Sequence, residues 1–300
     1  MRNLIKPKGL KSGAVIGISS FASLPKELDA VDRGVEFLEK HGLRVKIGRC
    51  AKRPCSDEEK AAELMRMFTD NEIDAIISVR GGYGTLRYID KLDYKVIKEH
   101  PKPLIGFSDI GSLLMAIYVK TGLVGFYGPM VASNFAKGSE FSFRNLFKVL
   151  NGEKIAVRTE HEPIFGGIAK GRLVGGCLSI LMTLICTDFD FSLKDSILFF
   201  EDVNEEGYRI DRMLTHLMLT GKLEEVKGIA VGRLTPPKGT SEDSLVDVLA
   251  ERLRRLGVPV AYGFQFGHMT DIITLPIGVE AELDADSGTL KLLEPAVERT

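Results

Sequence analysis

The segment Lys102-Pro-Leu-Ile-Gly-Phe-Ser-Asp-Ile-Gly111 joins a strand signal directly to a helix signal. A short apolar run at 104–105 ends at this turn, and apolar residues at helical spacing follow over 113–118. A serine at such a turn has an exposed hydroxyl beside the N–H groups of the helix start, the geometry that a nucleophilic serine needs. The other interpretation is an N-cap formed by Ser108 or Asp109. The hydrolase pattern G-x-S-x-G is not matched, because the second glycine falls one place late, so this segment alone leaves both interpretations open.

Outward from this segment, strand and helix signals alternate through the first half of the chain. Strands are expected at 14–18, 43–47, 73–79, 104–105 and 123–127, with helices at 28–38, 56–68 and 113–118. The continuous apolar runs at 14–18 and 73–79 predict buried strands, whereas apolar residues alternate in 43–47. The second helix begins with a capping box, Ser56-Asp-Glu-Glu59. This alternation predicts an α/β fold in which a Rossmann-like, largely parallel sheet has helices on both faces.

The pattern dissolves between about 134 and 170, where glycine, proline and polar residues predict loops. We therefore predict an N-terminal nucleophile domain at 1–134, a linker at 135–170 and a smaller C-terminal α/β domain at 171–300. In the last of these, strand signals occur at 197–200, 229–231, 258–264, 272–276 and 279–283, and helix signals at 210–218 and 245–256.

The composition favours a small-molecule or peptide substrate. Apolar residues make up 44% of the chain and charged residues 27%, and 40 Lys plus Arg against 41 Asp plus Glu give a net charge of -1. A near-neutral chain without a basic block has no electrostatic footprint for nucleic acid or an anionic membrane. No apolar run approaches the ~18 residues of a membrane span, and the apolar stretch at 14–18 is too short for a signal peptide. The sequence predicts a soluble cytoplasmic protein.

The four cysteines, at positions 50, 55, 177 and 186, are predicted to be reduced thiols that act as small core residues. No C-x-x-C occurs, and no pair of histidines at metal-ligand spacing lies near them. We therefore predict no metal and no cofactor.

Arg80-Gly-Gly-Tyr-Gly84 directly follows the strand expected at 73–79. Its glycines let the backbone approach a ligand and present N–H groups to negative charge. It could be a phosphate loop, although neither G-x-G-x-x-G nor the P-loop pattern is present. It could also supply an oxyanion donor to a site at Ser108, or be no more than a tight turn.

A nucleophilic serine needs a base and a carboxylate that orients the base. Of the five histidines, His268 lies in a loop just after a strand, where catalytic groups are often held, although it could simply bond to backbone there. Among the acids, Glu201 ends the apolar run at 197–200, and its neighbour Asp202 is the close competitor.

Taken together, these motifs resemble one family, the LD-carboxypeptidases, which include muramoyl-tetrapeptide carboxypeptidase and the microcin C immunity peptidase. The resemblance covers nearly the whole chain. It rests on six motifs in register: Arg80-Gly-Gly-Tyr-Gly84, Ile105-Gly-Phe-Ser-Asp109, Gly171-Arg-Leu-Val-Gly-Gly176, Phe199-Phe-Glu-Asp202 with Tyr208-Arg-Ile-Asp-Arg-Met213, Gly267-His268 and Leu275-Pro-Ile-Gly278.

The resemblance implies a Ser–His–Glu triad of Ser108, His268 and Glu201, and an oxyanion hole made by the backbone N–H groups of Gly82 and Asp109. It also implies a homodimer with the active site in a cleft between two domains. The implied reaction is the hydrolysis of a murein tetrapeptide, or a related muropeptide of cell-wall recycling, at its terminal D-amino acid.

Recognition of a C-terminal carboxylate favours an arginine. Arg80, with its neighbour Tyr83, is the candidate for substrate binding, and its rivals are Arg172, Arg209 and Arg212. Each of these arginines could instead form a structural ion pair. One departure from the family concerns Cys177, which stands where the family usually has the asparagine of G-G-N-L-S. A thiol cannot supply the paired donor and acceptor of an amide, so the choice of substrate is left open.

Two alternatives stay open. A microcin-type peptidase would act on an aminoacyl-nucleotide and would need a flat aromatic side chain against the base, often tryptophan, and this chain has none. A non-catalytic binder of peptides or nucleotides could use the glycine loop, but it would have no need of Ser, His and Glu at matching motif positions.

Overall fold

The computed structural model describes residues 3–239 and 242–298, which divide into two compact units. The first unit holds the chain up to Glu153 together with two returning segments, 270–278 and the stretch from Pro295 onward, and the second holds Lys154–Met269 and Val279–Glu294. The predicted boundaries at 134 and 170 differ from this division. A helix that the sequence pattern did not reveal, α5 (Glu140–Leu150), lies inside the predicted linker and belongs to the first unit.

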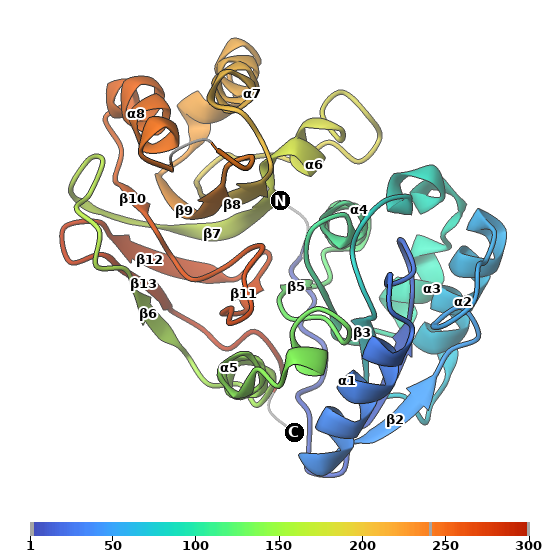
Figure 1. Ribbon diagram of the computed structural model, residues 1–300. Helices are drawn as coiled ribbons and strands as arrows, with labels where there is room; N and C mark the ends of the chain where they lie inside the picture. The colour runs from blue at the N-terminus through green and yellow to red at the C-terminus, as the bar shows by residue number, and fades with distance from the viewer. Residues whose placement is uncertain (1–2, 240–241, 299–300) are drawn as a thin grey trace. The chain divides into compact units, whose positions relative to one another are not determined.

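The first unit is built on a six-stranded sheet in the order β11-β5-β4-β3-β1-β2 (Figure 1). Its strands β1 to β5 are parallel, and β11 is antiparallel to β5. The strands span Val15–Ser19 (β1), Arg44–Ile47 (β2), Ala75–Ser78 (β3), Leu104–Gly106 (β4), Phe126–Tyr127 (β5) and Leu275–Pro276 (β11). The helices span Asp29–Lys40 (α1), Asp57–Thr69 (α2), Tyr94–Glu99 (α3), Ile110–Thr121 (α4) and Glu140–Leu150 (α5), with 3-10 turns at Thr85–Arg87 (η1), Ile89–Lys91 (η2) and Phe135–Lys137 (η3).

The strand order explains how the helices cover this sheet. The chain moves in one direction from β1 to β2 and then in the other through β3, β4 and β5. Right-handed crossovers therefore place α1 on one face and α2, α3 and α4 on the other, where α2 contacts α3 and α3 contacts α4. The predicted capping box opens α2, since Ser56 Oγ accepts from the Glu59 N–H at 3.2 Å and Glu59 Oε2 accepts from the Ser56 N–H at 2.9 Å.

The direction change between β1 and β3 decides where ligands can bind. In open parallel sheets, ligands bind outside the carboxyl ends of the strands at such a switch point. The segments that leave those ends here are 20–24 after β1, the glycine loop Arg80–Gly84 after β3, and the turn at Ser108 after β4.

The second unit is built on a seven-stranded mixed sheet in the order β10-β9-β8-β7-β12-β13-β6. Strands β7 to β10 are parallel, and β12, β13 and β6 extend the sheet in antiparallel fashion. The strands span Ala156–Arg158 (β6), Ile168–Cys177 (β7), Ser196–Val203 (β8), Gly228–Thr235 (β9), Val260–Tyr262 (β10), Glu280–Asp284 (β12) and Thr289–Leu292 (β13). The helices span Leu178–Met182 (α6), Gly207–Leu219 (α7) and Glu242–Leu253 (α8), with 3-10 turns at Lys222–Glu225 (η4) and Arg254–Leu256 (η5).

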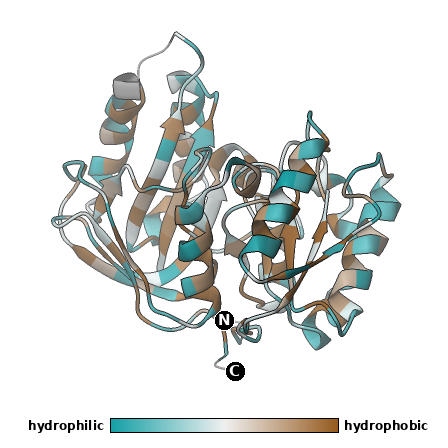
Figure 2. Cartoon of the chain, turned by 60° about the horizontal axis from the view of Figure 1, so that its bottom comes forward, coloured by the Kyte–Doolittle hydropathy of each residue, from teal (hydrophilic) through white to brown (hydrophobic). Residues whose placement is uncertain are grey.

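Each unit has its own apolar core around the central strands of its sheet. Strands β1 and β3 are buried throughout, as is most of β8. Figure 2 shows brown, hydrophobic residues on inner strands and teal, hydrophilic residues on the helices. Continuous apolar runs are typical of parallel strands covered on both faces, which is why the sequence located them. The predicted α/β class, with a Rossmann-like first part and a second part carrying additional β segments, is confirmed.

One prediction about the cysteines is wrong. Cys50 and Cys55 form a disulfide, and of the two free thiols Cys177 is buried as predicted, whereas Cys186 is exposed and is not a core residue. The prediction had applied a general rule about chain size and compartment to all four residues. A spacing of five residues lets the loop after β2 fold back and bring two sulfurs together, which such a rule does not register.

Candidate active site

Ser108 occupies a strained turn between β4 and α4. Its φ of 62° lies in the left-handed region, and among the described residues only Cys186, Asp195 and Asn204 share this property without being glycine. The left-handed conformation costs roughly 1–2 kcal/mol for a residue with a Cβ, and such outliers cluster at functional sites. The turn is held by the Ser108 N–H, which donates to the Tyr127 hydroxyl at 3.2 Å, and by the Ser108 carbonyl, which accepts from Gly111 at 2.8 Å.

The alternative interpretation of this turn as a helix cap is not supported. The N-cap position of α4 is Asp109, whose backbone is already helical, and no side-chain hydrogen bond caps the helix there. The strain at Ser108 therefore does not serve to cap the helix.

The glycine loop passes directly beside Ser108. A Cβ on Gly81 would lie 2.8 Å from the Cβ of Ser108, and a Cβ on Gly82, whose φ is +108°, would lie 2.6 Å from Ser23. Both positions therefore exclude a side chain. The loop is anchored to Ser23, whose N–H donates to the Gly81 carbonyl at 3.1 Å and whose Oγ accepts from the Tyr83 N–H at 3.0 Å.

The two N–H groups predicted for an oxyanion hole flank this contact. Within residues 3–239 and 242–298, no hydrogen-bond acceptor is assigned to the backbone N–H of Gly82 or of Asp109. Backbone N–H groups without an acceptor at a ligand-binding edge can bind a developing negative charge. The first unit thus brings together Ser108, the glycine loop and two available donors.

Glu201 and His268 meet in the second unit. Nδ1 of His268 lies 2.8 Å from Oε2 of Glu201, and since a carboxylate only accepts, the ring nitrogen donates. Glu201 lies near the end of β8 and is fully buried, whereas 22% of the His268 side chain is exposed. Gly267, with a φ of +108°, makes the approach possible, because a Cβ there would lie 2.4 Å from the Glu201 carboxylate.

The environment of His268 favours its protonated form. Burial lowers the pKa of His268, but the hydrogen bond to Glu201 and the negative charges of Glu201 and Asp202 outweigh it, so that the pKa lies above its ordinary value. A histidine whose Nδ1–H is fixed by a buried carboxylate has a defined tautomer, with Nε2 as its basic atom.

Asp202, the competitor of Glu201, has different partners. Its carboxylate accepts from the Ser179 N–H at 2.7 Å and the Val203 N–H at 2.9 Å, and lies 3.4 Å from the Cys177 sulfur. Burial and the neighbouring charge of Glu201 raise the pKa of Asp202 to about 6. Burial, together with the charges of Glu201 and Asp202, also raises the pKa of the Cys177 thiol well above its ordinary value. Cys177 is therefore a neutral, buried neighbour of Asp202.

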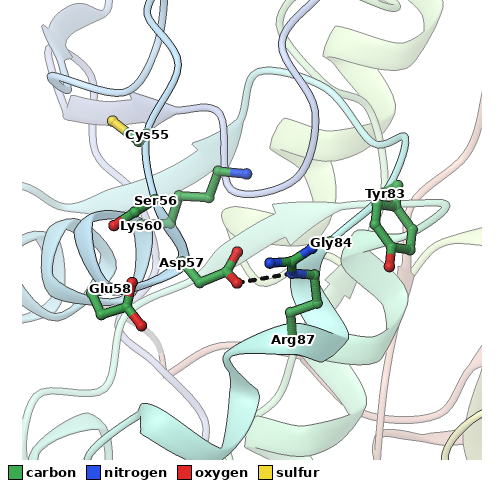
Figure 3. A pocket seen from close by; sticks show the side chains of 8 residues that line it. All are labelled: Cys55, Ser56, Asp57, Glu58, Lys60, Tyr83, Gly84 and Arg87. Carbon is green, nitrogen blue, oxygen red and sulfur yellow. Dashed lines mark hydrogen bonds and ion pairs between the residues drawn. The ribbon is translucent and has the colours of Figure 1, made fainter.

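The candidate substrate-binding residues differ in their environment. The Arg80 guanidinium donates to the Leu24 carbonyl at 2.8 Å, so this side chain is bound to a backbone group of the first unit. Tyr83 is 69% exposed, and it lines a cavity of about 460 Å³ beside the glycine loop together with Cys55, Lys60 and Arg87 (Figure 3).

The rival arginines have partners of their own. Arg172 pairs with Glu280, Arg209 with Glu205, and the guanidinium of Arg212 lies over the Tyr208 ring. The contacts of Arg172 and Arg209 are the structural ion pairs that the sequence had left open as an alternative, whereas Arg212 makes a cation–π contact instead.

The sequence did not predict several residues that hold the loops of the candidate site in place. Ser23, Tyr127 and Thr85 hold the glycine loop and the serine turn through side-chain hydrogen bonds. No sequence spacing links them to Ser108, and only their position at the carboxyl edge of the sheet could have suggested them. Among the described residues, no group of three or more His, Cys, Asp or Glu could hold a metal ion, and no helix is long and apolar enough to cross a membrane.

Comparison with known proteins agrees with this geometry. Residues 16–128 match the LD-carboxypeptidase N-terminal domain, and residues 170–283 match the LD-carboxypeptidase C-terminal domain. The chain is 36% identical to a probable murein peptide carboxypeptidase of Bacillus subtilis, over 95% of this chain and 93% of that protein.

Solved structures show the same fold. A MccF-like protein from Bacillus anthracis aligns with a TM-score of 0.88 at 27% identity, covering 96% of this chain and 99% of that one. Muramoyltetrapeptide carboxypeptidase from Oxalobacter formigenes aligns with a TM-score of 0.82 at 28% identity, covering 93% and 98%. The fold and the two matched domains define a serine-type peptidase. The chain belongs to the LD-carboxypeptidase family and is a serine-type carboxypeptidase.

Proposed function

We propose that this carboxypeptidase hydrolyses the bond to a C-terminal D-amino acid in murein tetrapeptides, with Ser108, His268 and Glu201 as its catalytic triad. The observation that carries the proposal is the 2.8 Å hydrogen bond between His268 and the fully buried Glu201. A histidine oriented in this way is the base that a serine nucleophile requires. The strained turn at Ser108 supports the same assignment from the other unit.

In the proposed reaction, His268 accepts the Ser108 hydroxyl proton as the serine oxygen attacks the carbonyl carbon of the terminal peptide bond. Negative charge develops on the carbonyl oxygen, and the Gly82 and Asp109 N–H groups stabilise it. The C–N bond then breaks, and His268 returns the proton to the amine of the departing D-amino acid. Water releases the acyl group from Ser108 by the same steps, while Glu201 stabilises the imidazolium each time it forms.

The substrate assignment draws on the relatives. The Bacillus subtilis relative is named for murein peptides, and the structure from Oxalobacter formigenes for a muramoyltetrapeptide. Tyr83 is proposed to contact the substrate from the exposed side of the glycine loop, with Arg80 beside it. The proposal includes action in cell-wall recycling in the cytoplasm by a homodimer.

A second candidate is hydrolysis of an aminoacyl-nucleotide. It is supported by 28% identity, over 95% of this chain, to the microcin C7 self-immunity protein MccF of Escherichia coli, a protein solved in complex with aspartyl sulfamoyl adenosine. The absence of tryptophan from the chain argues against it, because the flat aromatic against the base would have to be Phe or Tyr.

A substrate panel separates the two candidates. It contains a murein tetrapeptide, the same peptide ending in L-alanine, a dipeptide with terminal D-alanine and an aminoacyl sulfamoyl-adenosine, each assayed with the wild type and Ser108→Ala. We expect the tetrapeptide with terminal D-alanine to have the highest kcat/KM and the L-alanine form to be a poor substrate. Preferred cleavage of the sulfamoyl-adenosine would replace the murein proposal, and equal rates for the two diastereomers would remove the D-amino acid from it.

A further inference from the structure

A buried cluster ties the glycine loop to the serine turn. The backbone N–H of Thr85 donates to Oδ2 of Asp109 at 2.9 Å. Thr85 Oγ1 lies 2.7 Å from both that carboxylate oxygen and the Asp109 carbonyl, and 2.6 Å from Ser112 Oγ. Thr85 is fully buried, and Asp109 and Ser112 are 5% and 1% exposed.

The hydrogens available on Thr85 allow it to donate hydrogen bonds to Asp109. A hydroxyl has one proton and can also accept, so Thr85 can donate to Asp109, and the single Ser112 hydroxyl proton can go either to the Asp109 carbonyl, 3.0 Å away, or to Thr85 Oγ1. Together with its backbone N–H, Thr85 then supplies two donors to Asp109. Hydrogen bonds to an ionised acceptor are shorter and stronger than neutral ones. Breaking one in a buried site leaves a polar group without a partner, which destabilises the folded state.

Thr85 and Asp109 lie close in sequence to the two residues whose N–H groups are proposed to form the oxyanion hole. Thr85 begins η1, three residues after Gly82, and Asp109 directly follows Ser108. The two N–H groups of the proposed oxyanion hole therefore lie on the two segments that this cluster joins. An aspartate at an N-cap ordinarily accepts from its own helix. Asp109 instead caps no N–H of α4 and binds Thr85 across the sheet edge.

We propose that Thr85 and the Asp109 side chain are positioning groups that fix the spacing and direction of the Gly82 and Asp109 N–H donors relative to Ser108. This inference rests on the proposed serine mechanism. Neither side chain needs to touch the substrate. Their effect lies in the transition state, because oxyanion donors are useful only when they already point at the place where charge develops.

The test compares Thr85→Val with Thr85→Ser. Valine keeps the shape of threonine but removes the hydroxyl, and serine restores it. We expect Thr85→Val to lower kcat by roughly 10–100-fold with KM within about twofold, because loss of a whole oxyanion donor costs ~10²–10³ and this change only misplaces two. Thr85→Ser should recover most of kcat. Phosphonylation of Ser108 by a fluorophosphonate should slow in parallel with kcat, since its phosphoryl oxygen needs the same donors.

Thr121→Val is the matched control. Like Thr85, Thr121 is a buried threonine, with 3% of it exposed, but it lies on α4. Its Oγ1 donates to the Ile117 carbonyl at 2.6 Å and accepts from the Leu123 N–H at 3.0 Å. It lies at the opposite end of the helix from Ser108, so its loss should lower the unfolding temperature and leave kcat near wild type.

Wild-type kcat and labelling rate in folded Thr85→Val would overturn the positioning role, as would an equal loss of kcat in Thr121→Val. If Thr85→Val does not fold, Asp109→Ala, which removes the carboxylate that both Thr85 donors bind, gives the same comparison, and unchanged kcat there refutes the inference. Ser108→Ala, assayed alongside, separates failure of the proposed serine mechanism from failure of the positioning role. Retained activity in Ser108→Ala refutes the proposed mechanism itself, whereas an inactive Ser108→Ala beside a fully active Thr85→Val refutes only the positioning pair.

Discussion

His268 donates from Nδ1 to Oε2 of Glu201 over 2.8 Å, and this carboxylate is fully buried at the end of β8. The next residue along the strand, Asp202, accepts hydrogen bonds from Ser179 and Val203. Neighbouring side chains of a strand point to opposite faces, which is why only one of these two acids meets the histidine.

The first prediction compares the two acids. Glu201→Gln should lower kcat by about 10³–10⁴ with little change in KM, because the histidine loses the partner that sets its tautomer and stabilises its charged form. Asp202→Asn should cost much less, since Asp202 binds Ser179 and Val203 instead. Steady-state kinetics of both variants check this, and a larger loss in Asp202→Asn would move the triad acid by one residue.

The second prediction concerns pH. In the proposed mechanism His268 must be neutral to act as the base, and its pKa is raised above its ordinary value of 6.5, so kcat/KM should rise with pH through a midpoint above 6.5. In Glu201→Gln the negative charge that raises the pKa is gone, and the amide oxygen can accept only a weaker, neutral hydrogen bond, while burial still lowers the pKa, so the midpoint should move to lower pH. A pH–rate profile of the residual activity measures the shift. A midpoint that stays in place, or moves upward, would mean that Glu201 does not control the titration.

The third prediction concerns metal ions. Hydrolysis by Ser108 and His268 needs no metal, so activity should survive prolonged dialysis against millimolar EDTA. Loss of activity in EDTA that zinc restores would identify His268 and the acids beside it as metal ligands.

The fourth prediction concerns the disulfide. Closing the short loop between Cys50 and Cys55 should stabilise the folded state by about 2 kcal/mol, according to the chain-entropy account of cross-links. Denaturant unfolding with and without reductant should show this difference in the wild type and in the exposed-thiol control Cys186→Ser, and not in Cys50→Ser/Cys55→Ser. Alkylation of the unfolded, unreduced protein should modify two cysteines. Modification of all four would show that the disulfide does not form, as expected if the cytosol keeps these thiols reduced.

The sequence predicted the parts of the fold whose signals are local. Buried strands such as β1 and β3 are continuous apolar runs, and α2 begins at a capping box, so short segments contain all the information needed. Helix α5 was missed although Leu146, Val149 and Leu150 give it a buried face, because the glycine and polar residues on both sides of it predicted loops. Strand β11 could not be assigned to the first sheet, since its pairing with β5 joins segments far apart in the chain.

The candidate site divides in the same way. Ser108, Glu201 and His268 could be predicted as site residues because short motifs surround each of them. The left-handed turn at Ser108, the contact of Gly81 with that serine and the link from Thr85 to Asp109 depend on backbone conformation and on pairing between loops. No spacing in the sequence reports such contacts.

Covalent trapping of the nucleophile tests the central claim most directly. Wild type and Ser108→Ala are treated with a fluorophosphonate, and the intact mass and the modified peptide are determined, with kcat measured in parallel. The proposed mechanism predicts one adduct per chain, on Ser108, with activity lost in proportion to labelling, no adduct in Ser108→Ala and a kcat lower by about 10⁴ or more in that variant. Ser108→Ala with activity within about tenfold of wild type, or a fully labelled Ser108 in an enzyme that stays active, would contradict it.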